Sequence, residues 1–129
     1  MVKIYRPITE TWTFTKESFL EMFDTNNKIY HISKFGSVFP NIYHSLRLGQ
    51  GGRNHKGKQF LHMEFFIFAS RTIANISVNF KNANMEINLE NVTSKSETFY
   101  LPYKSLTQEM YVDGICEVEI SGLFEIEKD

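Results

Sequence analysis

The chain is poor in cysteine, with only Cys116 among its 129 residues. One cysteine cannot form an intramolecular disulfide, so burial of apolar surface must hold the fold together. No stretch approaches the roughly 18 apolar residues that a membrane-spanning helix needs, and the first residues, Met1 to Ile8, lack the apolar run of a signal peptide. We therefore expect an intracellular protein, in the cytoplasm or the nucleus, with no membrane partner.

An excess of charge of one sign is also missing, because the formal net charge is only -1. Such a chain has no overall field to attract a phosphate backbone, so nucleic acid is not an expected partner. The four histidines lack the paired spacing of metal ligands. Carboxylates at Asp24, Glu64 and Asp113 are scattered, without a pair for acid–base catalysis. We expect no metal, no cofactor and no enzymatic activity.

Aromatic residues are abundant, at 15% of the chain with twelve phenylalanines, which suits the core of a β-sheet protein. The segment Ile115 to Ile126 alternates between apolar and polar side chains, the pattern of a half-buried strand. Its inward residues are Cys116, Val118, Ile120, Phe124 and Ile126. On this pattern Cys116 is a core residue rather than a reactive thiol.

Similar patterns predict further strands along the chain, separated by turn residues. These are Thr11 to Phe14, Lys28 to Ser33, Asn41 to Leu48, Leu61 to Phe68, Ala74 to Lys81, Met85 to Leu89 and Phe99 to Tyr103. A short helix or irregular turn fits Lys16 to Phe23. The sequence thus predicts one all-β domain over residues 1–129, with its core at about 11–127. Its architecture is an antiparallel sandwich of seven or eight strands with at most one or two short helical turns.

Two segments in the middle of the chain suggest contacts with partners. Gly49 to Lys58 is predicted to be a solvated hairpin loop; the alternative is contact with an anionic partner through its basic residues, Arg53, Lys56 and Lys58. Leu61 to Phe68 is predicted to be a central strand buried on both faces. Within it Phe66 and Phe68 have the opposite parity to the other apolar residues, so a loop, a partner or a second protomer must cover them.

The order of these features resembles the MATH domain, the meprin and TRAF homology β-sandwich, from about Thr11 to Glu127. Three stretches carry the resemblance. They are Thr11-Trp12-Thr13-Phe14; then Tyr43, Arg47 and Leu48 with Phe60-Leu61-His62-Met63; and finally Phe99-Tyr100-Leu101-Pro102, Leu106, Tyr111-Val112-Asp113-Gly114 and the closing Glu-Val-Glu-Ile strand. The chain departs from the family at Glu64 and Ile76, where speckle-type adaptors carry aromatic groove residues.

The resemblance implies a non-enzymatic module that binds a protein or an extended peptide across one sheet. It further implies an adaptor that brings a substrate to ubiquitination or to another intracellular assembly. The residues it assigns to the peptide groove are Glu64, Phe66, Ile76 and Lys95, with Phe99, Tyr100 and Tyr103 beside them. The sequence shows no BTB segment, RING finger or heptad repeat, so we expect either an isolated domain of a longer protein or a domain that works alone.

Two other classes of function remain open from the sequence. A β-sandwich that binds a small ligand or carbohydrate would need a concave, aromatic-lined pocket with a few convergent polar groups. A homo-oligomeric structural domain would instead use an apolar face as its interface.

Overall fold

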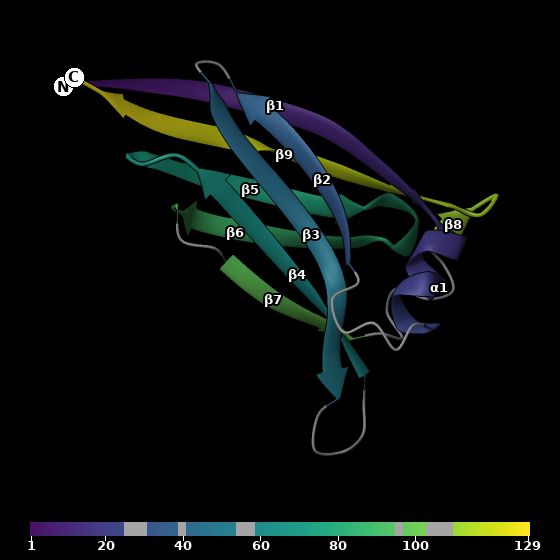
Figure 1. The fold of residues 1–129 in the computed structure, drawn as a ribbon. Helices are drawn as coiled ribbons and strands as arrows, with labels where there is room; N and C mark the ends of the chain where they lie inside the picture. The colour runs from purple at the N-terminus through teal and green to yellow at the C-terminus, as the bar shows by residue number, and fades with distance from the viewer. Residues whose placement is uncertain (25–30, 39–40, 54–58, 95–96, 103–109) are drawn as a thin grey trace.

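The computed structural model describes residues 1–24, 31–38, 41–53, 59–94, 97–102 and 110–129. Within these residues the chain forms nine strands in two antiparallel sheets that pack face to face (Figure 1). The predicted all-β sandwich is confirmed. The strand beyond the predicted eight is a two-residue pairing just before the closing strand.

The first sheet, which we call sheet A, contains both ends of the chain. Its strand order is β1-β9-β5-β6, with β8 paired to β9. The bounds are β1 Val2–Thr15, β5 Thr72–Phe80, β6 Met85–Val92, β8 Tyr111–Val112 and β9 Ile115–Lys128. Strands β1 and β9 pair along their whole length, from Val2 opposite Lys128 to Thr15 opposite Ile115. The two termini therefore lie side by side (Figure 1).

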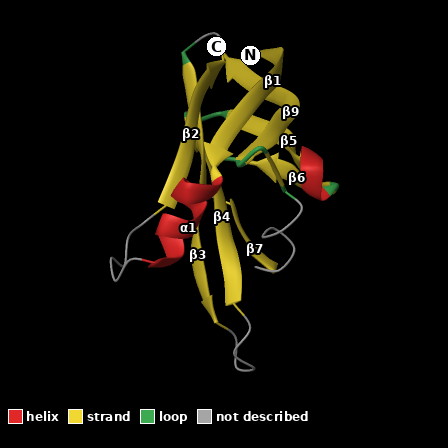
Figure 2. Cartoon of the chain, turned by 90° about the vertical axis from the view of Figure 1, so that its right-hand side faces the viewer, coloured by secondary structure: helices red, strands yellow, loops and turns green. Residues whose placement is uncertain are grey.

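The second sheet, sheet B, has the order β2-β3-β4-β7. Its strands are β2 His31–Val38, β3 Ile42–Arg53, β4 Gln59–Phe68 and β7 Glu97–Pro102. Because β2 and β7 are the edge strands, β3 and β4 form the centre of this sheet. Figure 2 shows the edge strand β2 alongside β1 of the other sheet.

The core lies between the two sheets and follows the alternation that the sequence displays. All five residues predicted to face inward on the closing strand are buried, including Cys116 and Phe124 at 0% exposure. Their counterparts on sheet B are the buried residues of alternate parity on β3 and β4, such as Leu46 and Phe65. The alternation of apolar and polar residues along the strands, rather than the strand propensity of single residues, therefore predicted these core positions correctly.

One end of the sandwich is closed by helix α1, Lys16–Asp24, which matches the predicted helical segment. The hydroxyl of Thr15 accepts a hydrogen bond from the Ser18 amide at 3.1 Å, the usual N-terminal cap. Phe19 on this helix is 1% exposed and packs against the rings of Phe14 and Tyr111. The helix thus covers the apolar end of the core (Figure 2).

Several strands extend beyond their predicted bounds. Strand β1 begins at Val2 instead of Thr11, and β2 runs through Gly36. Strand β3 continues to Arg53, so the first part of the predicted Gly49 to Lys58 loop is strand. The prediction that β4 is buried on both faces was wrong, because Phe68 is 56% exposed. The predicted bounds were too short because hydrogen bonding to a neighbouring strand keeps glycines and polar residues extended. The local sequence pattern contains no information about that pairing.

Two turns predicted from asparagine, aspartate and glycine are confirmed. Asn84 has φ 50° between β5 and β6, and Asp113 and Gly114 have φ 52° and 78° between β8 and β9. These residue types adopt the left-handed conformation at low cost. In the described part of the chain, helix α1 and the short 3-10 turn Lys81–Ala83 are the helical elements, and neither is long or apolar enough to cross a membrane.

The burial of Cys116 predicts that its thiol reacts slowly in the folded protein. Desolvation raises the pKa of its thiol to about 12, so its thiolate population lies about a thousandfold below that of an ordinary cysteine. We expect a thiol-specific disulfide reagent at neutral pH to leave the folded protein unlabelled and to label the unfolded chain in urea within minutes. Rapid labelling of the folded protein would contradict the core position of Cys116.

Candidate protein-interaction surface

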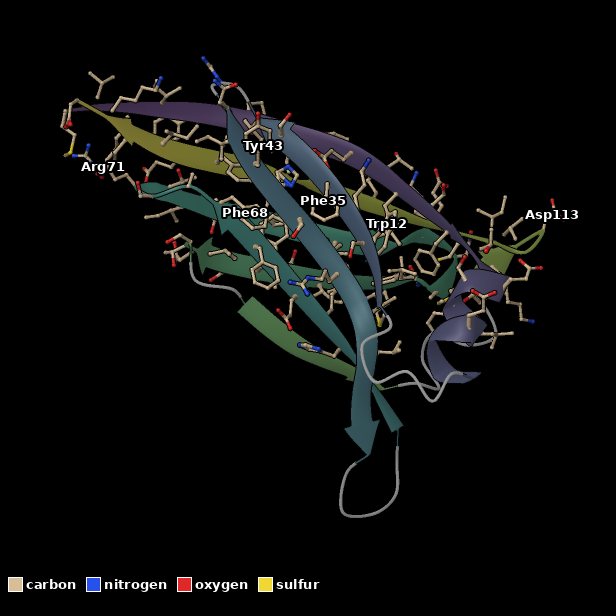
Figure 3. The ribbon with its side chains drawn as sticks, viewed as in Figure 1. Trp12, Phe35, Tyr43, Phe68, Arg71 and Asp113 are labelled. Atoms are coloured by element: carbon tan, nitrogen blue, oxygen red, sulfur yellow. The ribbon has the colours of Figure 1, made fainter. Side chains whose placement is uncertain are left out.

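The outer face of sheet B carries a group of exposed aromatic side chains. Phe35, Tyr43 and Phe68 are 68%, 55% and 56% exposed, and they come from three adjacent strands, β2, β3 and β4 (Figure 3). Strand register places Tyr43 beside Phe68, and places Ser45 between Phe35 and Phe66. We call Phe35, Tyr43, Phe66 and Phe68 the aromatic surface. Its residues share one face because their parity is opposite to that of the buried residues on the same strands.

Contacts within the aromatic surface hold its side chains in place. The rings of Phe66 and Phe68 stack with centroids 6.2 Å apart. The Arg47 guanidinium lies 4.7 Å from the centre of the Phe66 ring, within the range of a cation–π interaction. These side chains need to lose little conformational freedom on binding, which favours association.

A polar margin adjoins the aromatic surface along β3 and β4. Glu64 lies directly opposite Arg47 in the strand register. Its Oε1 is also 2.7 Å from His62 Nε2. An apolar patch with a charged margin of this kind is typical of an interface that fixes the orientation of its partner through polar contacts.

The outer face of sheet A has a different chemistry. Lys81 lies 3.2 Å from Glu119 and 3.7 Å from Glu117, and this arrangement raises the pKa of the lysine. Near the termini, Glu125 lies 3.5 Å from Lys3 and accepts a hydrogen bond from the Tyr5 hydroxyl at 3.1 Å. The row of glutamates on β9 is therefore a solvated face with its own cations, as its outward parity in the sequence predicts. The two outer faces of the sandwich are chemically distinct.

Not all of the predicted groove residues meet at one surface. Glu64 and Phe66 lie on the outer face of sheet B. Ile76 is 2% exposed, belongs to β5 of sheet A and points into the core, so its assignment to the groove was wrong. Ile76 aligns with an aromatic groove residue of the speckle-type adaptors, but in this fold it lies on the inward face of the other sheet.

The other predicted site residues lie wholly or partly outside the described region. Lys95, Tyr103, Lys56 and Lys58 are outside the described residues. The backbones of Phe99 and Tyr100 belong to β7, where they pair with Met63 and His62 of β4, but their side chains are not described. Arg53 pairs with Gln59 at the end of β3, again without a described side chain.

Sequence reasoning did not identify Phe35 and Tyr43 as surface residues. Phe35 falls between the predicted strands Lys28 to Ser33 and Asn41 to Leu48, so the sequence pattern assigns it no face. Extending the alternation of the strand through Gly36 would have placed Phe35 outward with Ser33 and Ser37. Tyr43 has the same outward parity relative to the buried Ile42 and Leu46.

Two hollows among the residues that the structure describes could receive a small ligand. A pocket of about 170 Å³ beside Arg71 is lined by Thr72, Thr93 and Ser94, among others. A broader, open hollow of about 350 Å³ lies between β1 and β2, with Arg6 and Glu10 in its lining. Neither has an aromatic side chain among its lining residues, whereas carbohydrate and drug-like ligands favour enclosed, aromatic-lined sites.

No protein-family model and no curated protein matches this chain. The candidate surface is therefore defined by the geometry and exposure of its own residues.

Proposed function

We propose that this protein is a non-enzymatic, intracellular binding module that receives an extended segment of another protein on the aromatic surface of sheet B. The observation that carries the proposal is the exposure of Phe35, Tyr43 and Phe68 on three adjacent strands. Antiparallel sheets that face water on one side normally present polar residues there. A contiguous group of exposed aromatics is instead typical of an interaction site.

The composition of this surface also supports a protein partner. Aromatic residues and arginine dominate the binding energy of protein interfaces, and here Tyr43, Phe68 and Arg47 lie on one face. The outer face of sheet A also exposes Tyr5 and Leu123, at 52% and 41%. They lie among carboxylates that are matched by Lys3 and Lys81, and the Tyr5 hydroxyl donates a hydrogen bond to Glu125. The aromatic surface is therefore the face that we expect to turn toward the partner.

An extended segment suits the shape of this site. A chain laid across a sheet can place alternate side chains against the aromatic rings while Arg47 and Glu64 bind its polar groups. The sequence resemblance to MATH domains suggests the same mode of binding and extends the proposal to an adaptor that brings its target to ubiquitination or another assembly. That extension rests on the resemblance alone.

The test uses peptides selected for binding to the folded protein from a display library of short random sequences. We expect Phe68→Ser and Tyr43→Ser each to weaken the affinity for a selected peptide at least tenfold, or about 1.4 kcal/mol, because each removes an exposed anchor. Fluorescence anisotropy with a labelled peptide measures the change. The matched control is Leu123→Ser, a 41% exposed residue on the outer face of sheet A.

Two outcomes would contradict the proposal. One is a selected peptide whose affinity falls with Leu123→Ser and stays constant with Phe68→Ser and Tyr43→Ser. The other is a dimeric mass by light scattering that becomes monomeric on Phe68→Ser, which would make the aromatic surface a contact between copies of this chain. Failure to select any peptide would leave no extended segment for the site and would also count against it.

A further inference from the structure

An ionisable pair, with a buried histidine and a glutamate that is 19% exposed, joins the two sheets at the seam where β1 lies beside β2. Glu10 extends inward from β1 of sheet A, and His44 extends inward from β3 of sheet B. His44 Nε2 lies 3.1 Å from Glu10 Oε1. The imidazole is 2% exposed and lies against the rings of Phe65 and Phe124, with centroid distances of 5.7 Å and 5.4 Å. The apolar core therefore surrounds the imidazole, while the Glu10 carboxylate borders the open hollow between β1 and β2.

The surrounding structure makes space for this pair. A Cβ added at Gly36 on β2 would overlap the Glu10 carboxylate and would lie 2.6 Å from His44 Cε1. Among the described residues, neither Glu10 Oε2 nor His44 Nε2 has an aligned hydrogen-bond partner. Buried polar atoms without such partners destabilise a fold, so their protonation state affects the stability of this seam strongly.

Other charges near the pair come from the edge strands. Lys34 on β2 lies close enough to act electrostatically on both Glu10 and His44. Arg6 shares the inward parity of Glu10 on β1, two inward positions away. The neighbours from β4 and β9 are the apolar rings of Phe65 and Phe124. Among the described groups that face His44, the Glu10 carboxylate is thus the one that can supply a negative charge.

We propose that Glu10 and His44 together carry only one proton and form an acid-sensitive clasp across the β1–β2 seam. With one proton present, the pair exists either as a neutral carboxyl beside a neutral imidazole or as an ion pair, and both forms are compatible with burial. A second proton leaves a buried imidazolium near Lys34 without a counter-anion. Exposure of His44 to water relieves that state, and it requires β2 to move away from β1.

The direction in which folding stability changes with pH follows from the pKa shift of each group. Burial, followed by Lys34, lowers the pKa of His44, so its contribution to stability is present above pH 6.5 and is lost as the pH falls. Burial raises the pKa of Glu10, although Lys34 opposes this, so its contribution is present below pH 4.5 and is lost as the pH rises. Between these values the two contributions oppose each other, and the wild-type seam changes little.

Single substitutions separate the two contributions. We expect the folding equilibrium constant of Glu10→Gln to fall as the pH is lowered from about 6.5, by up to tenfold per pH unit, because only His44 still titrates. Relative to wild type, His44→Gln should change in the opposite direction and recover stability as the pH approaches 4.5. The double variant should show neither trend. Urea unfolding across this pH range measures all four proteins, and parallel pH profiles would overturn the limit of one proton for the pair.

The wild-type protein provides a second test that no variant can compromise by misfolding. In a pH titration followed by imidazole ¹⁵N chemical shifts, we expect His44 to show no separate titration step near pH 6.5. Hydrogen exchange should show that acid reduces the protection of β2 amides before that of β5 amides, because β2 lies at the seam. An ordinary histidine titration in the folded protein, or equal loss of protection in β2 and β5, would contradict the clasp.

Discussion

Replacement of Phe124 by alanine is expected to lower the free energy of unfolding by about 3–5 kcal/mol, the usual range for deleting a buried phenylalanine ring. Phe124 is 0% exposed on β9, which pairs with β1 on one side and β5 on the other. Its ring also packs against His44 of the opposite sheet. Fixed neighbours on both sides limit collapse into the cavity, so the loss should fall in the upper part of this range.

The matched control for Phe124 is the preceding residue. Leu123 is 41% exposed on the opposite face of the same strand, so Leu123→Ala should cost less than about 1 kcal/mol. Urea denaturation monitored by the fluorescence of Trp12 measures both variants, since this buried tryptophan is the only one in the chain. Similar losses for the two substitutions would show that β9 is not buried on one face as described.

Gly122→Ala is expected to destabilise the protein by about 3 kcal/mol, at the upper end of the usual cost of overpacking. A Cβ at this position would overlap the Asn75 carbonyl oxygen and lie 3.0 Å from the Ile76 Cα. These are backbone atoms of the paired strand β5, so no side-chain rotation can relieve the overlap. Strand β5 also has an irregular register toward β6 between Ala74 and Ile76, next to this contact.

A second glycine distinguishes overpacking from loss of glycine in general. Gly114 has φ 78° and nothing within 4 Å of an added Cβ, and asparagine tolerates the left-handed conformation. Gly114→Asn should therefore cost less than about 1 kcal/mol in the same denaturation experiment. If Gly122→Ala were as mild as Gly114→Asn, the close approach of β9 to β5 would be refuted.

The pairing of β1 with β9 explains why these core positions matter for the whole fold. The two strands join the ends of the chain over fourteen residues each. Closing a loop between such distant segments costs more entropy than forming a local contact, so packing against β9 must offset that cost for sheet A to form.

The interaction surface and the seam were only partly accessible to sequence reasoning. The opposite parity of Phe66 and Phe68 indicated an uncovered face. Glu10, however, lay upstream of the predicted first strand, and Ile76 was assigned to a surface that it does not reach. Both errors involve pairings between distant segments, which a local pattern does not reveal.

The sequence by itself determined the approximate positions of most strands, the inward face of the closing strand, the helix after Thr15 and the turns at Asn84 and Asp113. These features depend on side-chain alternation and on local backbone preferences, which are properties of neighbouring residues. The tertiary structure alone decided that Phe35, Tyr43 and Phe68 share one exposed face and that Glu10 meets His44 across the seam. Strand order and register control those meetings, because they bring together residues that no local interaction relates.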